Sequence, residues 1–137
     1  MTNLKKIHYR VVCAVITNDG RALAVQRSKK MKMPLLWEFP GGKVHDGESD
    51  ESALIREIHE ELGCTIRIIS PMTAVYHEYL KFSIDLIPFH AEMLSSSVVL
   101  SEHVDLHWCT ARELRGLEWC EADIGISEEA AALLQYV

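Results

Sequence analysis

Three glutamates and one arginine stand close together in the chain, in the order Arg56, Glu57, Glu60 and Glu61. On a helix, side chains three and four positions apart share one side, so this spacing gathers the three carboxylates there. Such a cluster repels itself, and Arg56 is placed to orient a carboxylate as well as to offset its charge. Mg²⁺ takes oxygen ligands and keeps positions for water and substrate phosphates. The cluster therefore indicates a site for a hard divalent cation, and the alternative is a solvated acidic helix face.

A helix running roughly from residue 50 to residue 62 must carry these side chains. Ser49 is a good N-cap because its hydroxyl can accept from backbone N–H groups that are unpaired at a helix start. Gly63 has the position of a glycine that ends a helix. Apolar residues recur at helical spacing and predict a face that packs on the core: Ala53, Leu54, Ile58 and Leu62.

The wider segment from residue 42 to residue 64 resembles the Nudix box, a signature of fixed glycine, glutamate, arginine and bulky aliphatic positions. The matching positions are Gly42, Glu48, Arg56, Glu57, Ile58, Glu60, Glu61, Gly63 and Cys64. Every polar and glycine position fits. Cys64 departs from the usual aliphatic residue, which should weaken packing slightly and leave the chemistry alone. By this segment the chain is identified as a member of the Nudix family.

The resemblance implies a Mg²⁺ site, with Mn²⁺ as a possible substitute. The implied metal ligands are Glu57, Glu60, Glu61, the carbonyl of Gly41 and, as an outer ligand, Glu102. It also implies that Arg56 and Glu48 hold the carboxylates in place. The general base varies within the family, so three candidates stay open: Glu60, Glu61 and Glu102.

Two segments outside the box resemble MutT-like Nudix enzymes and supply candidate phosphate contacts. Residues 36–43 are similar to the WEFPGGK segment that leads into the box, which assigns a phosphate contact to Lys43. Arg27 follows the second predicted strand, where MutT-like enzymes carry a phosphate-contacting arginine, and a guanidinium suits bidentate phosphate binding. The nearby lysines at 29, 30 and 32 are explained equally well by a solvated loop.

The segment from Glu102 to Trp108 resembles the E-H-x-x-x-x-W segment of the MutT-like group, whose glutamate reaches the metal site. Its two histidines, His103 and His107, invite a transition-metal interpretation. No second pair of soft ligands accompanies them, and carboxylates dominate elsewhere. We therefore predict that both histidines are surface or strand residues.

Asp123 is the candidate base reader. It lies in a segment that resembles L-x-W-x-x-A-D-x-P of MutT-like pyrophosphatases, where the prototype has an asparagine that contacts a purine. An ionised carboxylate only accepts hydrogen bonds, so it would favour the donor edges of guanine or cytosine. Alternatively, Asp123 is simply the N-cap of the last helix.

Aromatic residues near residue 80 could stack on a base, although each is more often part of a core. They are Tyr76, Tyr79 and Phe82. Tyr79 lies near the place where diadenosine polyphosphate hydrolases hold a tyrosine, and it is included among the candidate substrate-binding residues.

The strand pattern accompanies these sites. Residues 7–17 and 22–26 predict a hairpin across the turn signal Asn18-Asp19-Gly20. Residues 82–93 predict a long strand, in which Pro88 argues for an edge position or a bulge. Thr110 and Glu113 form a capping box that starts a short helix. The resemblance makes the fold specific: a single Nudix domain over residues 1–137, an α/β/α sandwich with a mixed sheet.

Composition limits the function classes. The chain has 137 residues, 48% hydrophobic and 25% charged, which is the profile of a soluble globular protein. The net charge of −6 argues against a stable nucleic-acid partner. The four cysteines show no metal-binding or disulfide pattern and are expected to be packed, reduced thiols of a cytoplasmic protein. We expect no membrane association, and the sequence is silent on oligomeric state.

The reaction that the resemblance implies is hydrolysis of a nucleoside diphosphate linked to another group. The favoured substrate is a nucleoside triphosphate, either 8-oxo-dGTP in pool sanitation or a cytidine nucleotide such as CTP, dCTP or 5-methyl-dCTP. Within the same fold, a dinucleoside polyphosphate, ADP-sugar or capped-RNA hydrolase is the alternative. From a different class, the chain could be an inactive nucleotide-binding module, although such a module needs no intact set of carboxylates.

Overall fold

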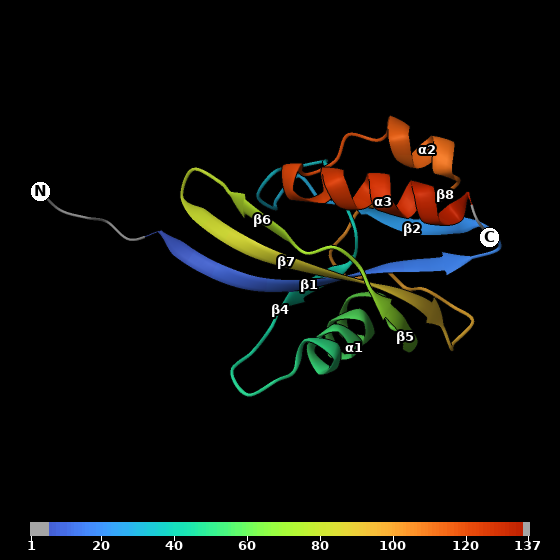
Figure 1. The fold of residues 1–137 in the computed structure, drawn as a ribbon, viewed down its shortest axis with the longest axis horizontal. Helices are drawn as coiled ribbons and strands as arrows, with labels where there is room; N and C mark the ends of the chain where they lie inside the picture. The colour runs from blue at the N-terminus through green and yellow to red at the C-terminus, as the bar shows by residue number, and fades with distance from the viewer. Residues whose placement is uncertain (1–5, 136–137) are drawn as a thin grey trace, which may run out of the picture.

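The computed structural model describes residues 6–135, which form an α/β structure with helices on both faces of a mixed sheet (Figure 1). In chain order the elements are β1 (Ile7–Asn18), β2 (Arg21–Gln26), β3 (Trp37–Glu38), β4 (Gly41–Lys43), α1 (Asp50–Leu62), β5 (Ile66–Pro71), β6 (Val75–Glu78), β7 (Phe82–Met93), β8 (Asp105–Cys109), α2 (Ala111–Gly116), a 3-10 turn (Glu121–Asp123) and α3 (Ile124–Leu134). The predicted α/β/α architecture is confirmed.

Strand β1 is the centre of the sheet. Along residues 7–16 it pairs in parallel with β7, while β4 pairs antiparallel with residues 11–13. The last two residues of β1 form the predicted hairpin with β2, which pairs in turn with β3 and β8. The sheet therefore has two parts that share β1, one with β4 and β7 and the other with β2, β3 and β8. The box lies beside the part that contains β4.

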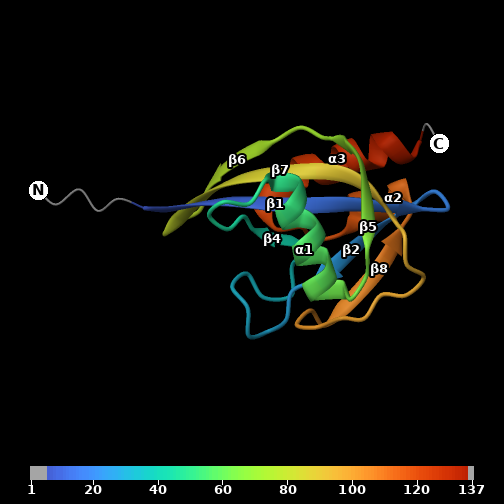
Figure 2. The same ribbon diagram turned by 90° about the horizontal axis from the view of Figure 1, so that it is seen from below.

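Both faces of β1 are covered, which explains its continuous apolar run. Val12, Ala14 and Ile16 pack in one cluster with the buried residues of α1. Cys13 and Val15 point to the opposite cluster, which contains residues of α2 and α3. Figure 1 shows α1 on one side of β1 and β7 with α2 and α3 on the other, and Figure 2 shows α1 crossing these strands.

Helix α1 has the predicted bounds and caps. The Ser49 hydroxyl accepts from the N–H of Ser52 at 3.1 Å. Gly63 has a φ of 63°, in the left-handed region that favours glycine, and its N–H donates to the carbonyl of His59. The four residues predicted to face the core are all buried. The two caps therefore fix where α1 begins and ends, and with this the positions of the box glutamates along the helix.

The remaining local predictions hold with one exception. The capping box of Thr110 and Glu113 starts α2. Pro88 was predicted at an edge position or a bulge, but β7 is a central strand with partners on both sides. Pro88 lies between the part of β7 that pairs with β6 and the part that pairs with β5. The predicted irregularity is instead in the facing strand, where the register shifts between Ile68 and Ser70.

The four cysteines are packed in the interior, as predicted. All four cysteines are free and buried. Burial raises the pKa of the Cys109 and Cys120 thiols to about 12. Within residues 6–135, no helix combines the length and the apolar composition that a membrane crossing requires.

The packing of α1 gives a testable prediction. Leu54 is completely buried, whereas its neighbour Ile55 is 42% exposed. Leu54→Ala leaves a cavity between α1 and β1 and should lower the free energy of unfolding by about 3 kcal/mol. Ile55→Ala is the matched control and should cost less than about 1 kcal/mol. Urea titrations followed by circular dichroism measure both, and equal losses would contradict the packing of α1.

Candidate active site

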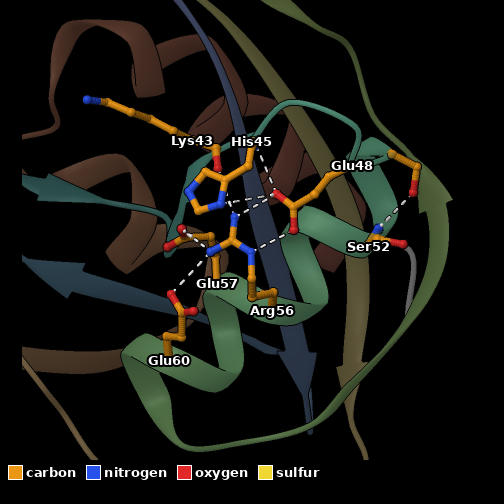
Figure 3. Close-up of polar contacts among 8 residues, drawn as sticks. Lys43, His45, Glu48, Ser52, Arg56, Glu57 and Glu60 are labelled. Carbon is orange, nitrogen blue, oxygen red and sulfur yellow. Dashed lines mark hydrogen bonds and ion pairs between the residues drawn. The ribbon is translucent and has the colours of Figure 1, made fainter.

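The guanidinium of Arg56 lies at the centre of the acidic cluster (Figure 3). Its Nε and Nη2 donate to the two carboxylate oxygens of Glu48 at 2.7 and 2.8 Å. Its Nη1 donates to Glu57 at 2.8 Å and to Glu60 at 3.2 Å. Nη2 also donates to the carbonyl of Lys43 at 3.1 Å. One side chain therefore ties β4, the loop before α1 and two box carboxylates together.

The charge of Glu48 is fixed by this contact. Hydrogen bonds from Arg56 and from the N–H of His45 lower the pKa of Glu48 to about 2. The hydrogen bonds of Arg56 to Glu48 and to Glu57 raise the pKa of its guanidinium. Both partners are thus charged at every pH at which the protein would work, and the loop before α1 keeps its anchor.

Two glycines allow the backbone of β4 to approach its neighbours closely. A Cβ atom on Gly41 would lie 1.9 Å from the carbonyl oxygen of Val12, and one on Gly42 would lie 2.3 Å from the carboxylate of Glu57. No side chain fits at either position without movement. The N–H of Gly41 donates to Oε1 of Glu61 at 3.0 Å. The glycines therefore bring the backbone against two box carboxylates.

Glu61 is partly buried and differs electrostatically from an exposed glutamate. Its pKa is raised to about 8, mainly by burial, and the carboxylates of Glu38 and Glu57 act in the same direction. The charge of His103 and the N–H of Gly41 act in the opposite direction. An ionised Glu61 lacks full compensation for its charge, and a nearby cation would supply it.

The box residues fit Mg²⁺ by their chemistry. All the predicted donors are oxygen atoms, which are the ligands that Mg²⁺ prefers, and Glu61 is a buried acid that a cation would favour in its ionised form. Within residues 6–135, however, no three His, Cys, Asp or Glu side chains form a group that could hold a metal ion. One carboxylate oxygen of Glu57 and one of Glu60 accept a hydrogen bond from Arg56. The metal roles of these residues stay predictions.

The segment before β8 contains one correct and one wrong prediction. His107 is exposed on β8 and contacts Glu113, as expected for a strand residue. His103 is not a surface residue, because its side chain is only 2% exposed and its Nε2 lies 2.7 Å from Glu38. Burial lowers the pKa of His103, but the hydrogen bond to Glu38 and the charges of Glu61 and Glu38 outweigh it. Glu102, next in the chain, is exposed.

A cavity of about 340 Å³ opens between β4, β7 and the 3-10 turn. It brings six predicted site residues together: Arg27, Gly41, Lys43, Glu61, Tyr79 and Asp123. The remaining predicted site residues do not line it: Glu48, Arg56, Glu57, Glu60 and Glu102. One end of the cavity thus meets the box at Glu61, and Asp123 lies in its wall.

Positively charged groups border this cavity. Nη1 of Arg27 donates to both oxygens of Glu38 at 3.0 Å, and its Nε donates to the carbonyl of Lys32. The Nζ of Lys32 lies 5.1 Å from the centre of the Phe82 ring, and that of Lys43 lies 4.0 Å from the centre of the Tyr9 ring. These cations offset the acidic net charge at the place where an anionic ligand would enter.

Asp123 is buried in the cavity wall. It occupies the N-cap position of α3, as the alternative from the sequence had it, but its carboxylate makes no capping hydrogen bond to the helix. Its Oδ2 instead accepts from the N–H of Phe39 at 2.9 Å. Burial, followed by the charge of Glu38, raises the pKa of Asp123 to about 8. Near neutral pH it is therefore mainly protonated, and it can donate as well as accept a hydrogen bond.

The aromatic residues divide between the cavity and the surface. Tyr79 and Phe82 stack with their ring centres 4.8 Å apart, and both line the cavity. The Tyr79 hydroxyl accepts from the N–H of Ala122 at 3.2 Å. Tyr76 is 59% exposed, stacks on His8 and does not line the cavity, so it lies apart from the other two.

A family match covers nearly all of the described chain. The family described as "NUDIX domain" matches residues 6–132. The chain belongs to the Nudix family. The enzyme is accordingly a Nudix pyrophosphohydrolase of the MutT-like group, as the box predicted.

Known Nudix proteins are similar over most of their length. A CTP pyrophosphohydrolase of Escherichia coli (strain K12) is 35% identical over 123 residues, which are 90% of this chain and 91% of that protein. A putative 8-oxo-dGTP diphosphatase 2 of Mycobacterium tuberculosis (strain ATCC 25618 / H37Rv) is 32% identical over 125 residues, 90% and 89% of the two chains. The crystal structure of a MutT protein from Methanosarcina mazei Go1 has a TM-score of 0.85 at 27% identity, covering 96% and 98%.

Two residues of this Nudix site were not singled out from the sequence. Glu38 lines the cavity and contacts both Arg27 and His103. Phe39 lines it too and stacks on Trp119, with ring centres 4.7 Å apart. A glutamate inside the otherwise apolar segment LLWEFP is a signal that could have identified Glu38, because a charge in a core strand needs a partner.

The raised pKa of Asp123 predicts how the stability of this Nudix enzyme depends on pH. The pKa is about 8 in the folded chain, against 3.8 for an ordinary aspartate. The folded state therefore binds more protons than the unfolded chain between these values, and stability falls as the pH rises through this range. The loss attributable to Asp123 approaches about 1.4 kcal/mol per pH unit within the window. Asp123→Asn keeps an acceptor for Phe39 and should show a flatter profile from pH 5 to 8 in urea titrations. If the stability of the wild type and that of the variant changed with pH in the same way, the raised pKa of Asp123 would be contradicted.

Proposed function

We propose that this Nudix enzyme hydrolyses nucleoside or deoxynucleoside triphosphates to a monophosphate and pyrophosphate with Mg²⁺. The biological substrate is either an oxidised guanine nucleotide such as 8-oxo-dGTP or a cytidine nucleotide such as CTP, dCTP or 5-methyl-dCTP. The observation that carries the proposal is the single cavity that joins Glu61 of the box to the buried Asp123. A triphosphate chain at the box and a base beside Asp123 together describe a nucleotide.

The relatives support this substrate class. Two proteins are each similar over 90% of this chain, one named as a CTP pyrophosphohydrolase and the other as a putative 8-oxo-dGTP diphosphatase. Both names describe nucleoside triphosphates. The cavity volume of about 340 Å³ lies within the usual range for small-molecule sites and suits one nucleotide.

Charge on the transferred group would be met by fixed donors. Water attacks phosphorus in line, and negative charge builds on the non-bridging and leaving oxygens. Arg27 and Lys43, which line the cavity, would stabilise that negative charge. Arg56 and Glu48 would hold the box residues in position. Bound Mg²⁺ would supply further charge stabilisation and activate water, held by Glu57, Glu60, Glu61 and the Gly41 carbonyl, with Glu102 as an outer ligand.

Glu61 is the favoured general base among the three candidates. It lines the cavity, its Oε1 is fixed by the N–H of Gly41, and its pKa is raised, which makes it a stronger base than an ordinary glutamate. Glu60 is exposed and bonded to Arg56. Glu102 is exposed and does not line the cavity. Both remain alternatives.

Base recognition is assigned to Asp123, with Tyr79 beside it in the wall. In its protonated form, Asp123 offers a hydroxyl donor while Oδ2 is engaged by Phe39, so the acceptor-only argument from the sequence no longer limits the base. Guanine and cytosine both carry acceptors as well as donors, and both remain compatible with this residue.

Two alternative functions remain, one with the same chemistry on another substrate and one without catalysis. A dinucleoside polyphosphate, ADP-sugar or capped-RNA hydrolase would use the same box, and the placement of Tyr79 in the cavity keeps the dinucleotide version open. An inactive nucleotide-binding module would leave the box carboxylates without a purpose.

The test of the proposed function is release of pyrophosphate and phosphate with Mg²⁺ across a nucleotide panel. The panel contains the common NTPs and dNTPs, 8-oxo-dGTP, 5-methyl-dCTP, ADP-ribose and diadenosine polyphosphates. Pyrophosphate release that favours a guanine or cytosine triphosphate is expected. Activity confined to ADP-ribose or dinucleotides would overturn the proposed substrate class. Nucleotide binding without turnover would favour the inactive binding module.

Glu61→Gln should cut kcat by about 100-fold or more, because an amide cannot take a proton from the attacking water and is a poorer ligand for Mg²⁺ than a carboxylate. Its amide oxygen still accepts from the N–H of Gly41, so the fold should persist. Glu51→Gln is the matched control, since Glu51 is an exposed glutamate in the first turn of the same helix. Steady-state kinetics at saturating Mg²⁺ decide the matter: wild-type turnover by the Glu61 variant would remove Glu61 from the catalytic group.

Asp123→Asn should change base preference more than kcat on a good substrate. The amide of asparagine donates a hydrogen bond at every pH, whereas the carboxyl group of Asp123 stops donating when it loses its proton. The measurement is kcat/KM across the same triphosphates at pH 6 and pH 9. Wild type should change its preference between the two pH values, and the variant should not. An unchanged ranking in both proteins would remove Asp123 from base recognition.

A further inference from the structure

His103 is a buried polar side chain beside the cavity, and the reaction scheme above does not use it. Its side chain is 2% exposed, and its Nε2 lies 2.7 Å from Oε2 of Glu38. Its Nδ1 is buried and has no hydrogen-bond partner within residues 6–135. An apolar residue would fill this space without leaving a nitrogen unpaired, so the contact with Glu38 needs a specific explanation.

Glu38 connects His103 to Arg27. Both oxygens of Glu38 accept from Nη1 of Arg27 at 3.0 Å, and Oε2 is also the atom next to His103. An ionised carboxylate only accepts, so Nε2 of His103 must carry the proton and donate it. The carboxylate of Glu38 is thus held from two sides, and it cannot turn without breaking one of these contacts.

Backbone pairing builds this three-residue network. Glu38 on β3 lies opposite Val25 of β2, and Arg27 follows directly after the end of β2. The N–H of Val104, next to His103, donates to the carbonyl of Gln26 at 3.0 Å. Three segments that are distant in the sequence are therefore fixed around the end of β2, which places their side chains in contact.

We infer that His103 is a positioning residue, which fixes Glu38 and thereby orients the guanidinium of Arg27 at the cavity wall toward the substrate phosphates. The inference deepens the proposed function and rests on it, because it assigns Arg27 to the phosphate chain. His103 does not line the cavity, so it acts only through Glu38.

The hydrogen bonds of Arg27 show what this orientation achieves. Nη1 is held by Glu38 and Nε by the carbonyl of Lys32, whereas Nη2 has no acceptor in the described part of the chain. The guanidinium is planar, so fixing two of its nitrogens also fixes the direction of the third. Nη2 is the donor that this arrangement leaves for a phosphate oxygen.

A matched pair of amides tests the inference. His103→Gln places its amide nitrogen near the position of Nε2 and can still donate to Glu38, whereas His103→Asn places its amide near Nδ1 and cannot. His103→Asn should raise KM for the preferred triphosphate about tenfold, the size of one lost charge-assisted hydrogen bond, with a much smaller change in kcat. His103→Gln should recover most of the affinity. Equal KM values for the two variants would overturn the inference.

Coupling to Arg27 separates positioning from a local packing defect. In an Arg27→Ala background, His103→Asn should raise KM little further, because the residue on which it acts is gone. Additive effects on KM would show that His103 acts independently of Arg27. If His103→Asn fails to fold, Glu38→Gln asks the same question from the centre of the network, with the same non-additivity expected.

A readout without substrate distinguishes this inference from the proposed function. The Nε–Hε resonance of Arg27 in the free protein should shift or broaden in His103→Asn and stay close to wild type in His103→Gln. An unchanged resonance in His103→Asn would overturn the positioning role. If the wild-type enzyme hydrolyses no triphosphate while the resonance responds as expected, the proposed function fails and the network stands.

Discussion

The site depends on the close passage of β4 against β1. The backbone at Gly41 lies so near the carbonyl of Val12 that a Cβ atom cannot be accommodated, whereas a Cβ atom on Gly42 would meet the movable carboxylate of Glu57. This approach is what allows a backbone N–H to hold Glu61 and brings the Lys43 carbonyl to Arg56. A side chain at position 41 would force β4 away from β1 and displace the N–H that holds Glu61.

The electrostatics of the site follow from how much each carboxylate is buried. Glu48 is ionised because Arg56 and a backbone N–H hold it, whereas burial favours the neutral forms of Glu61 and Asp123. Carboxylates of the same chain thus acquire different protonation from their surroundings alone. A protein with a net charge of −6 can in this way present a cavity that accepts an anion.

Local structure and the box could be predicted from the sequence, and long-range contacts could not. The caps at Ser49 and Gly63 and the apolar spacing determine α1 because these signals act within a few residues. The parallel pairing of β1 with β7 has no comparable local signal in the sequence. The edge position predicted for Pro88 was wrong because the unpaired site on that side of β7 depends on where β5 and β6 end. His103 was taken for a surface residue because its partner Glu38 is 65 positions away. Asp123 was treated as ionised because burial cannot be read from its neighbours in the chain.

The anchoring of the loop before α1 has a consequence for the entropy of binding. Residues 44–49 are held at both ends by contacts that exist without any ligand, since Arg56 bonds Glu48 and the Lys43 carbonyl within the protein itself (Figure 3). The freedom of this loop is therefore lost during folding and not when a nucleotide arrives. A box that is ordered in advance leaves more of the interaction energy with the phosphates available for holding the reacting atoms in line.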